Sequence, residues 1–161
     1  MIGDPERILI ETGVDAGVLA HCRAVAAVAR AWEGSPLVDR NLLRAGAMLH
    51  DIGRSVTHSV EHAQIGASLC RSRGLPEPVA RIVERHIGGG LTADECNLLE
   101  IPPKDCMPQT LEERIVAHAD NLVEGDREAS IYRLLQQSTW LKRRYRKRIY
   151  RLCLDVELFR G

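Results

Sequence analysis

A histidine and an aspartate stand side by side at positions 50 and 51, where the apolar run 42–49 ends. Burying a carboxylate at the edge of such a run is costly unless a positive charge compensates it, and a bound cation is a strong compensator. Imidazole and carboxylate together suit divalent iron, manganese, nickel or zinc, whereas magnesium and calcium prefer oxygen ligands. A transition-metal site at His50-Asp51 is therefore the first hypothesis.

Further histidines and an aspartate fall at predicted helix ends or on apolar helix faces, and these are His21, His62, His86 and Asp120. Helices of a bundle can direct such side chains toward one interior point. Taken singly, each histidine is more simply explained as hydrogen-bonded structure or surface. His118 is left out of the candidate site, because it lies two residues before Asp120 and points about 200° away from it on a helix. The residues alone leave a metal site and structural histidines both open.

The elements that must position these residues are predicted from capping signals. Asp4, Asp15, Asp39 and Ser59 can each cap a helix, and Thr92 with Glu95 and Thr110 with Glu113 form two capping boxes. Gly53 is predicted to end the helix that delivers the doublet. A long amphipathic helix is predicted over about 138–159. No stretch alternates apolar and polar residues convincingly, so the predicted fold is an all-α, single-domain helical bundle over 1–161, with its metal-site core at about 15–125.

Composition agrees with a globular helical protein. Hydrophobic residues make up 45% of the 161 residues, charged residues 27% and aromatic residues only 4%, which favours an aliphatic core. The 22 basic and 22 acidic side chains balance, so no global field attracts membranes or polyanions. The five cysteines form no Cys-x-x-Cys pair and are expected to be reduced. Without a signal peptide or an apolar run of membrane-spanning length, we expect a cytoplasmic protein that binds no membrane.

The order His21, His50-Asp51-Ile52-Gly53, His62, His86 and Asp120 resembles the HD-domain (HDIG-type) superfamily of metal-dependent phosphohydrolases. The segments 57–63, 85–92 and 119–122 resemble small stand-alone archaeal members. The resemblance implies that His21, His50, Asp51 and Asp120 bind one metal, that Asp51 bridges to a second, and that His62 and His86 hold this second ion. Relatives that degrade cyclic dinucleotides often have a further histidine where this chain has Ile87, so one second-site ligand is missing.

The implied activity is hydrolysis of a phosphomonoester or phosphodiester, in a nucleotide or another small phosphorylated substrate, by a metal-activated water. One or two ions of iron, manganese, nickel or zinc would serve, with Asp51 as the catalytic bridge that helps to activate the water. Arg54 and His58 follow the doublet and could grip the phosphate. A surface salt bridge explains Arg54 equally well.

Three alternatives stay open. The same six ligands would serve an HD-type diiron oxygenase. A nucleotide sensor with vestigial catalysis would bind its nucleotide without converting it. The basic run 142–148, interrupted by Tyr145, suggests a third alternative, a module that binds nucleic acid. A solvated helix face explains this run more simply, so no nucleic-acid partner is expected. The sequence leaves a homo-oligomer open.

Overall fold

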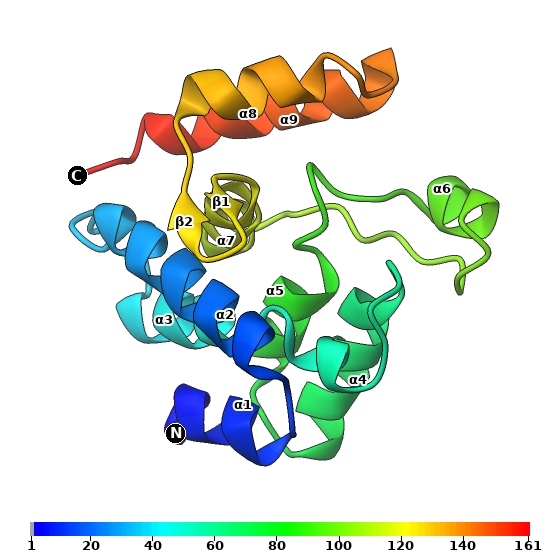
Figure 1. Cartoon of the computed structure of the whole chain (residues 1–161). Helices are drawn as coiled ribbons and strands as arrows, with labels where there is room; N and C mark the ends of the chain where they lie inside the picture. The colour runs from blue at the N-terminus through cyan, green and yellow to red at the C-terminus, as the bar shows by residue number, and fades with distance from the viewer. Residues whose placement is uncertain (1) are drawn as a thin grey trace.

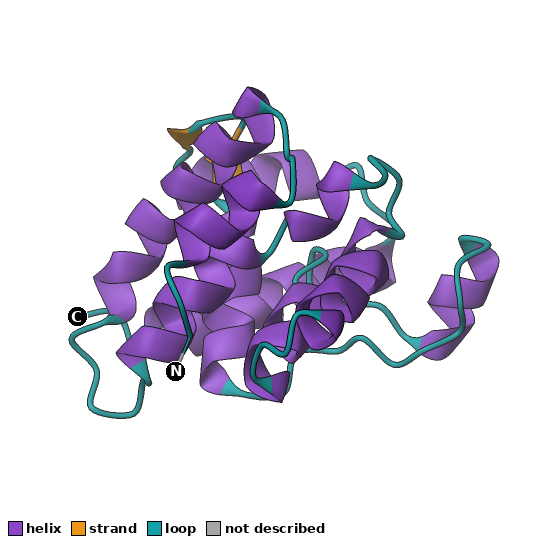
Figure 2. Cartoon of the chain, turned by 90° about the horizontal axis from the view of Figure 1, so that it is seen from below, coloured by secondary structure: helices purple, strands orange, loops and turns teal. Residues whose placement is uncertain are grey.

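The computed structural model describes residues 2–161 and is built almost entirely of helices, with two short strands at one edge (Figures 1 and 2). The α-helices are α1 (Pro5–Glu11), α2 (Ala16–Ala29), α3 (Arg40–Leu49), α4 (His62–Ser72), α5 (Glu77–Glu84), α6 (Ala93–Leu98), α7 (Leu111–Asn121), α8 (Ile131–Ser138) and α9 (Arg143–Glu157). The 3-10 helices η1 (Arg30–Trp32) and η2 (Ile52–Ser55) and the antiparallel strands β1 (Val123–Glu124) and β2 (Arg127–Glu128) complete the chain. The all-α prediction is confirmed, and the single domain over 1–161 stays a prediction.

Most of the predicted caps form. The Asp39 carboxylate accepts hydrogen bonds from two backbone N–H groups of the first turn of α3, and both capping boxes close, at Thr92 for α6 and at Thr110 for α7. Such caps satisfy N–H groups that have no partner within the helix. Ser59 is an exception, because α4 begins only at His62 and has no side-chain cap. The side chains that start α3 and α7 thus fix where the helix next to His50 and the helix that carries Asp120 begin.

The core is arranged around α7, which packs against α2, α3 and α5 and also against α9. One apolar cluster joins α2, α3, α7 and α9 and includes Val25, Leu43, Ile115 and Leu152. A second cluster joins α1–α5 and includes Leu49, Ile52 and Val83. These two clusters hold the helices that carry the candidate ligands. In Figure 1, α6 lies apart from them, at the end of two extended segments.

The chain after residue 130 differs from the prediction of one helix over about 138–159. It forms two antiparallel helices, α8 and α9, seen side by side in Figure 1. The hydroxyls of Ser138 and Thr139 donate to carbonyls within α8, which competes with continued helix formation. Lys142 is extended, with φ −54° and ψ 143°. Trp32 Nε1 then ties α9 to the body by donating to the Val156 carbonyl at 2.8 Å.

Gly53 has a different role from the one predicted. The helix that carries the doublet ends at Leu49, with His50 as its C-cap, and Gly53 lies inside η2. A Cβ atom at this position would stand 1.9 Å from the His62 carbonyl oxygen and 2.7 Å from the Gly66 nitrogen. Glycine is therefore required because the backbones of η2 and α4 touch here.

All five cysteines are buried and unpaired. Within residues 2–161, no helix is both long enough and apolar enough to cross a bilayer.

Candidate metal centre

The structure gathers all six predicted ligands at one place, although they come from separate elements. His21 lies on α2, His50 caps the C-terminus of α3, and Asp51 follows it. The others lie at the start of α4, just after α5 and near the end of α7, and these are His62, His86 and Asp120. His50, Asp51, His62 and His86 are buried, while His21 and Asp120 are partly exposed. The cluster is thus open to solvent on one side.

One half of the cluster surrounds Oδ2 of Asp51. Nε2 of His50 lies 3.8 Å from this oxygen and Nε2 of His21 lies 3.9 Å from it. Asp120 Oδ1 lies 2.9 Å from His21 Nε2 and 3.5 Å from His50 Nε2. The atoms of His21, His50 and Asp120 are close enough together to hold a single metal ion.

The other half surrounds Oδ1 of Asp51. Nε2 of His62 lies 2.9 Å from this oxygen and Nε2 of His86 lies 3.5 Å from it. The two Nε2 atoms are 3.2 Å apart. The two oxygens of Asp51 therefore face different pairs of histidines, which is the geometry that a carboxylate bridging two ions needs.

The other ring nitrogen of each histidine meets a backbone carbonyl. His21 Nδ1 lies 2.6 Å from the Gly125 oxygen and His50 Nδ1 lies 2.8 Å from the Ala47 oxygen. The corresponding partners of His62 and His86 are the carbonyls of residues 59 and 83, at 2.7 and 2.6 Å. A carbonyl can only accept, so we assign the proton to Nδ1 in all four rings. In the neutral rings each Nε2 then presents a lone pair to the centre, as metal-binding histidines do.

Two buried atoms of the cluster lack a hydrogen-bond partner, namely His50 Nε2 and Asp51 Oδ1. His62 Nε2 is near Oδ1, but not in hydrogen-bonding geometry. Lone pairs of nitrogen and oxygen thus face one another in a buried space, which is unfavourable without a cation between them. The donor set of four imidazoles and two carboxylates fits a divalent transition metal.

The carboxylates remain ionised in this setting. Burial by itself would raise the pKa of Asp51, but the neighbouring His50 and the contacts with His62 and His86 outweigh it and hold this pKa well below its usual range. Asp120 behaves in the same way, because His21 and His50 lower its pKa against the effect of burial. The centre therefore offers two anionic ligands at neutral pH.

An open cleft of about 320 Å³ lies over the exposed side of the cluster and is lined by Asp15, Gly17, Val18, His21, Asp51, Arg54, His58 and Gly125. Both predicted phosphate-binding residues reach it. Arg54 Nε donates to Asp51 Oδ2 at 2.6 Å and keeps 30% of its side chain exposed. His58 is 66% exposed, with Nε2 lying 3.8 Å from Asp15 Oδ2. A guanidinium thus contacts the carboxylate that faces both histidine pairs, and an imidazole lies at the rim of the same cleft.

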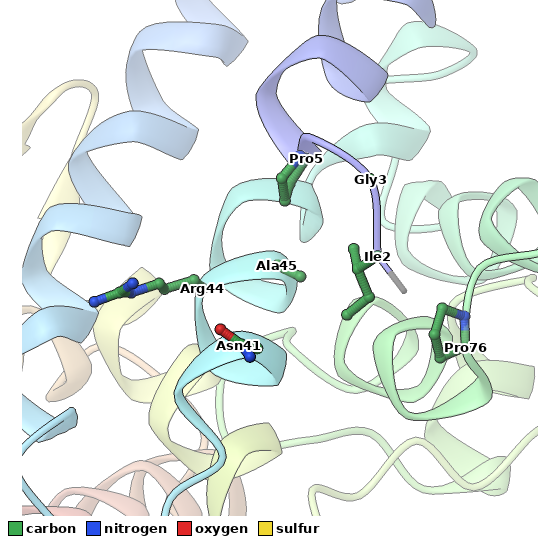
Figure 3. Close-up of a pocket in the computed structure, with 7 residues that line it drawn as sticks. All are labelled: Ile2, Gly3, Pro5, Asn41, Arg44, Ala45 and Pro76. Atoms are coloured by element: carbon green, nitrogen blue, oxygen red, sulfur yellow. The ribbon is translucent and has the colours of Figure 1, made fainter.

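A larger pocket of about 500 Å³ lies elsewhere, between the N-terminal segment and α3 (Figure 3). Ile2, Pro5, Asn41, Ala45 and Pro76 are among its lining residues. None of the six clustered residues lines it, and its walls offer no group for acid–base or metal chemistry. Of the two, only the smaller cleft is lined by residues of the cluster, namely His21 and Asp51.

Sequence reasoning missed the hairpin β1–β2. Gly125 at its tip, with φ +63°, supplies the carbonyl that orients His21, and it also lines the cleft. The dipeptide Gly125-Asp126 is a turn signal that could have indicated the hairpin. His118, which was left out of the candidate site, lies apart from the cluster, and its Nε2 lies 2.9 Å from Glu157 Oε1 on α9. Ile87 packs against an apolar cluster that includes Leu91, so position 87 adds no ligand.

Comparison with known proteins adds to this geometry. The family model described as "HD domain" matches residues 18–124. The chain is 49% identical over 120 residues to an uncharacterised protein of Methanocaldococcus jannaschii, a match that covers 71% of this chain and 70% of that protein. It is 42% identical over 130 residues to a tRNA (cytidine(56)-2'-O)-methyltransferase of Picrophilus torridus, covering 81% of this chain and only 38% of the methyltransferase.

Among solved structures, the HD domain of the L. monocytogenes phosphodiesterase PgpH in complex with cyclic-di-AMP has a TM-score of 0.61. The match covers 96% of this chain and 95% of that domain at 18% sequence identity, so it establishes a common fold. The match of the family model includes every residue of the His/Asp cluster. This chain belongs to the HD-domain family.

Proposed function

We propose that the chain is a metal-dependent phosphohydrolase that cleaves phosphate esters of a small, nucleotide-like substrate. The observation that carries the proposal is the carboxylate of Asp51, whose two oxygens face different histidine pairs at 2.9 to 3.9 Å. His21, His50 and Asp120 would hold one metal with Asp51, and His62 and His86 would hold a second. A metal bound there supplies Lewis acidity, which activates water and polarises a phosphoryl oxygen.

The residues of the chain would divide the remaining work between them. The four backbone carbonyls keep each Nε2 free of a proton and aimed at the centre. Arg54 would bind a non-bridging phosphate oxygen through its free N–H groups, and His58 would add a second contact from the rim of the cleft. A volume of about 320 Å³ is at the small end of ligand sites, which span about 300–1,000 Å³. The cleft therefore suits one nucleotide or one end of a larger ester.

The structural neighbour PgpH supports a nucleotide-like substrate, because its HD domain is described in complex with cyclic-di-AMP. That ligand belongs to PgpH, and its transfer to this chain is part of the proposal. Iron, manganese, nickel and zinc all suit the donor set, so the identity of the bound metal should be measured first.

The test begins with metal analysis of protein purified without chelators. Asp51→Asn and His62→Gln should lower the metal content, since each removes a ligand atom. His118→Gln is the matched control, because His118 is equally buried but lies outside the cluster, and it should keep its metal. Metal-loaded protein is then screened with phosphomonoesters, nucleotides and cyclic dinucleotides.

The alternatives predict different results in the same screen. A diiron oxygenase would consume oxygen with iron bound and leave phosphate esters intact. A sensor would bind a nucleotide tightly without turnover. Protein that contains no transition metal, or Asp51→Asn protein with unchanged metal content, would show that the proposed centre does not exist.

A further inference from the structure

The charges of this neutral chain are strongly segregated. Residues 129–154, which include α8 and most of α9, contain eight basic side chains and no acidic one. The remainder of the chain therefore carries 14 basic side chains against all 22 acidic ones. A local excess of this kind attracts polyanions even when the net charge is zero.

Some of these cations serve the fold. Arg148 Nη2 lies 2.7 Å from Glu95 Oε2 and Arg144 Nε lies 3.3 Å from Glu95 Oε1, so both residues fasten α9 to α6. Arg133 pairs in the same way with Glu124 at 3.1 Å. These arginines are explained by ion pairs within the chain.

Other basic residues on the same surface have no such explanation. Within residues 2–161, no carboxylate lies within salt-bridge distance of Lys142, Arg143, Lys147 or Arg151, and all four are exposed. Arg143, Lys147 and Arg151 recur every four residues, so they share one face of α9. A groove of about 560 Å³ lies at this face and is lined by Lys147, Arg148, Tyr150, Arg151, Leu154 and Asp155. Its three cations outnumber its one carboxylate, and Tyr150 adds an aromatic ring.

Two large aromatic side chains stand out from the same helical pair. Trp140, in the turn between α8 and α9, is 92% exposed, and Tyr132 at the start of α8 is 85% exposed. Trp140 directly precedes the basic run that begins at Lys142. Exposed aromatic rings on the same pair of helices as a cationic groove form a combination that suits single-stranded nucleic acid, with bases stacking on the rings and phosphates following the charges.

An anionic membrane is the competing partner for a basic amphipathic helix. Here the apolar stripe of α9 is already buried against the body of the protein, through Ile149, Leu152 and Val156. The helix cannot turn that stripe toward lipid without leaving the core. The face that remains free carries the basic side chains and one exposed leucine, Leu154. A single leucine offers a lipid surface little apolar area to bury, so the charges of this face favour a solvated polyanion.

We propose that the surface formed by Tyr132, Trp140, Lys142, Arg143, Lys147 and Arg151 binds single-stranded nucleic acid, independently of the metal centre. The sequence alone favoured a solvated helix face for the basic run. Within residues 2–161, three cations of this run and the nearby Arg151 have no ion pair, and both rings are exposed, which changes that expectation.

The experiment titrates the full chain with fluorescently labelled single-stranded RNA and DNA, in EDTA so that any hydrolysis is stopped. Four phosphate contacts predict a slope of log K against log salt near −3, or roughly 50-fold weaker binding at 200 mM than at 50 mM salt. Intrinsic fluorescence gives a second readout, because Trp32 is fully buried and Trp140 is the exposed tryptophan of the two. Stacking should quench the emission of Trp140, and Trp140→Phe should remove this signal.

Matched variants distinguish binding at this surface from a nonspecific attraction between nucleic acid and any basic residue. Lys147→Glu with Arg151→Glu should abolish measurable binding, whereas Arg40→Glu with Arg73→Glu, which changes two exposed arginines on other helices, should leave it within a few fold. Trp140→Ala should weaken binding about 5- to 150-fold. Circular dichroism checks that each variant is folded.

Three outcomes would overturn the proposal: no binding at 50 mM salt, equal losses in both charge-reversal pairs, or a preference for anionic vesicles over oligonucleotides. Metal content and phosphohydrolase activity play no part in these readouts. The proposal can therefore fail while the proposed function stands, and the reverse also holds.

Discussion

An alanine at position 53 is the sharpest test of how the fold positions the metal centre. Its methyl carbon would stand 1.9 Å from the carbonyl oxygen of His62, whereas real Cβ contacts essentially never fall below 3.0 Å. The backbones of η2 and α4 must then separate by about 1.1 Å, the difference of these two distances. Asp51 precedes η2 and His62 begins α4, so the substitution should move apart two ligands of the proposed second metal position.

The nature of the contact sets the size of the effect. Overpacking costs roughly 1–3 kcal/mol, and the upper end applies because the obstacle is backbone, which cannot rotate away. Each kcal/mol lowers Tm by about 2–4 °C in a chain of this length. Gly53→Ala should therefore melt about 6–12 °C below the wild type. It should also lose metal, since sites tolerate displacements of only about 0.5 Å.

Thermal melting followed by circular dichroism and metal analysis of the same samples measure both effects. Gly13→Ala is the matched control, because Gly13 has φ +84° and an added methyl group there would meet no atom within 4 Å. It should lose about 1–2 kcal/mol through backbone strain alone and keep its metal. A Gly53→Ala protein that binds as much metal as the wild type and melts within about 2 °C of it would refute the reasoning.

Three further predictions follow from buried or functional charges. Arg85→Met leaves the buried carboxylate of Glu113 without the cation that lies 2.9 Å away. Urea denaturation should show that the free energy of unfolding falls by about 3–5 kcal/mol. A fall of less than about 1 kcal/mol would contradict this prediction. Burial would raise the pKa of Glu84, but Arg71 and Lys104 outweigh it and lower this pKa. The ionised carboxylate therefore stabilises the fold above its unfolded pKa of about 4.3, and this stabilisation is lost as the pH falls. Tm should fall more steeply below about pH 5 in the wild type than in Glu84→Gln, and parallel curves of Tm against pH would exclude this role. Arg54→Ala should raise the KM of a phosphate ester about 10-fold, the loss of about one charge-assisted hydrogen bond. An unchanged KM would show that Arg54 does not bind the substrate.

Local sequence signals predicted the elements that start on a capping side chain. Asp39 starts α3 and Thr110 starts α7 as predicted, because a side-chain acceptor two or three residues before an unpaired N–H acts over a few atoms of the same chain. The signals failed where competing bonds decided the outcome. Ser138 and Thr139 bond back to carbonyls of α8, so the predicted helix over about 138–159 is shortened to α9 and preceded by a turn.

The amino-acid sequence by itself determined the helical fold and the set of candidate ligands, because helix periodicity, caps and the His-Asp doublet are local properties that residue types and spacing express directly. The tertiary structure decided which atoms meet. That the two oxygens of Asp51 face different histidine pairs, and that the Gly125 carbonyl orients His21 from 104 residues away, depends on helix packing that no spacing along the chain contains. Tertiary packing also decided that Gly53 is needed for contact between η2 and α4, since the atom it would strike belongs to another element.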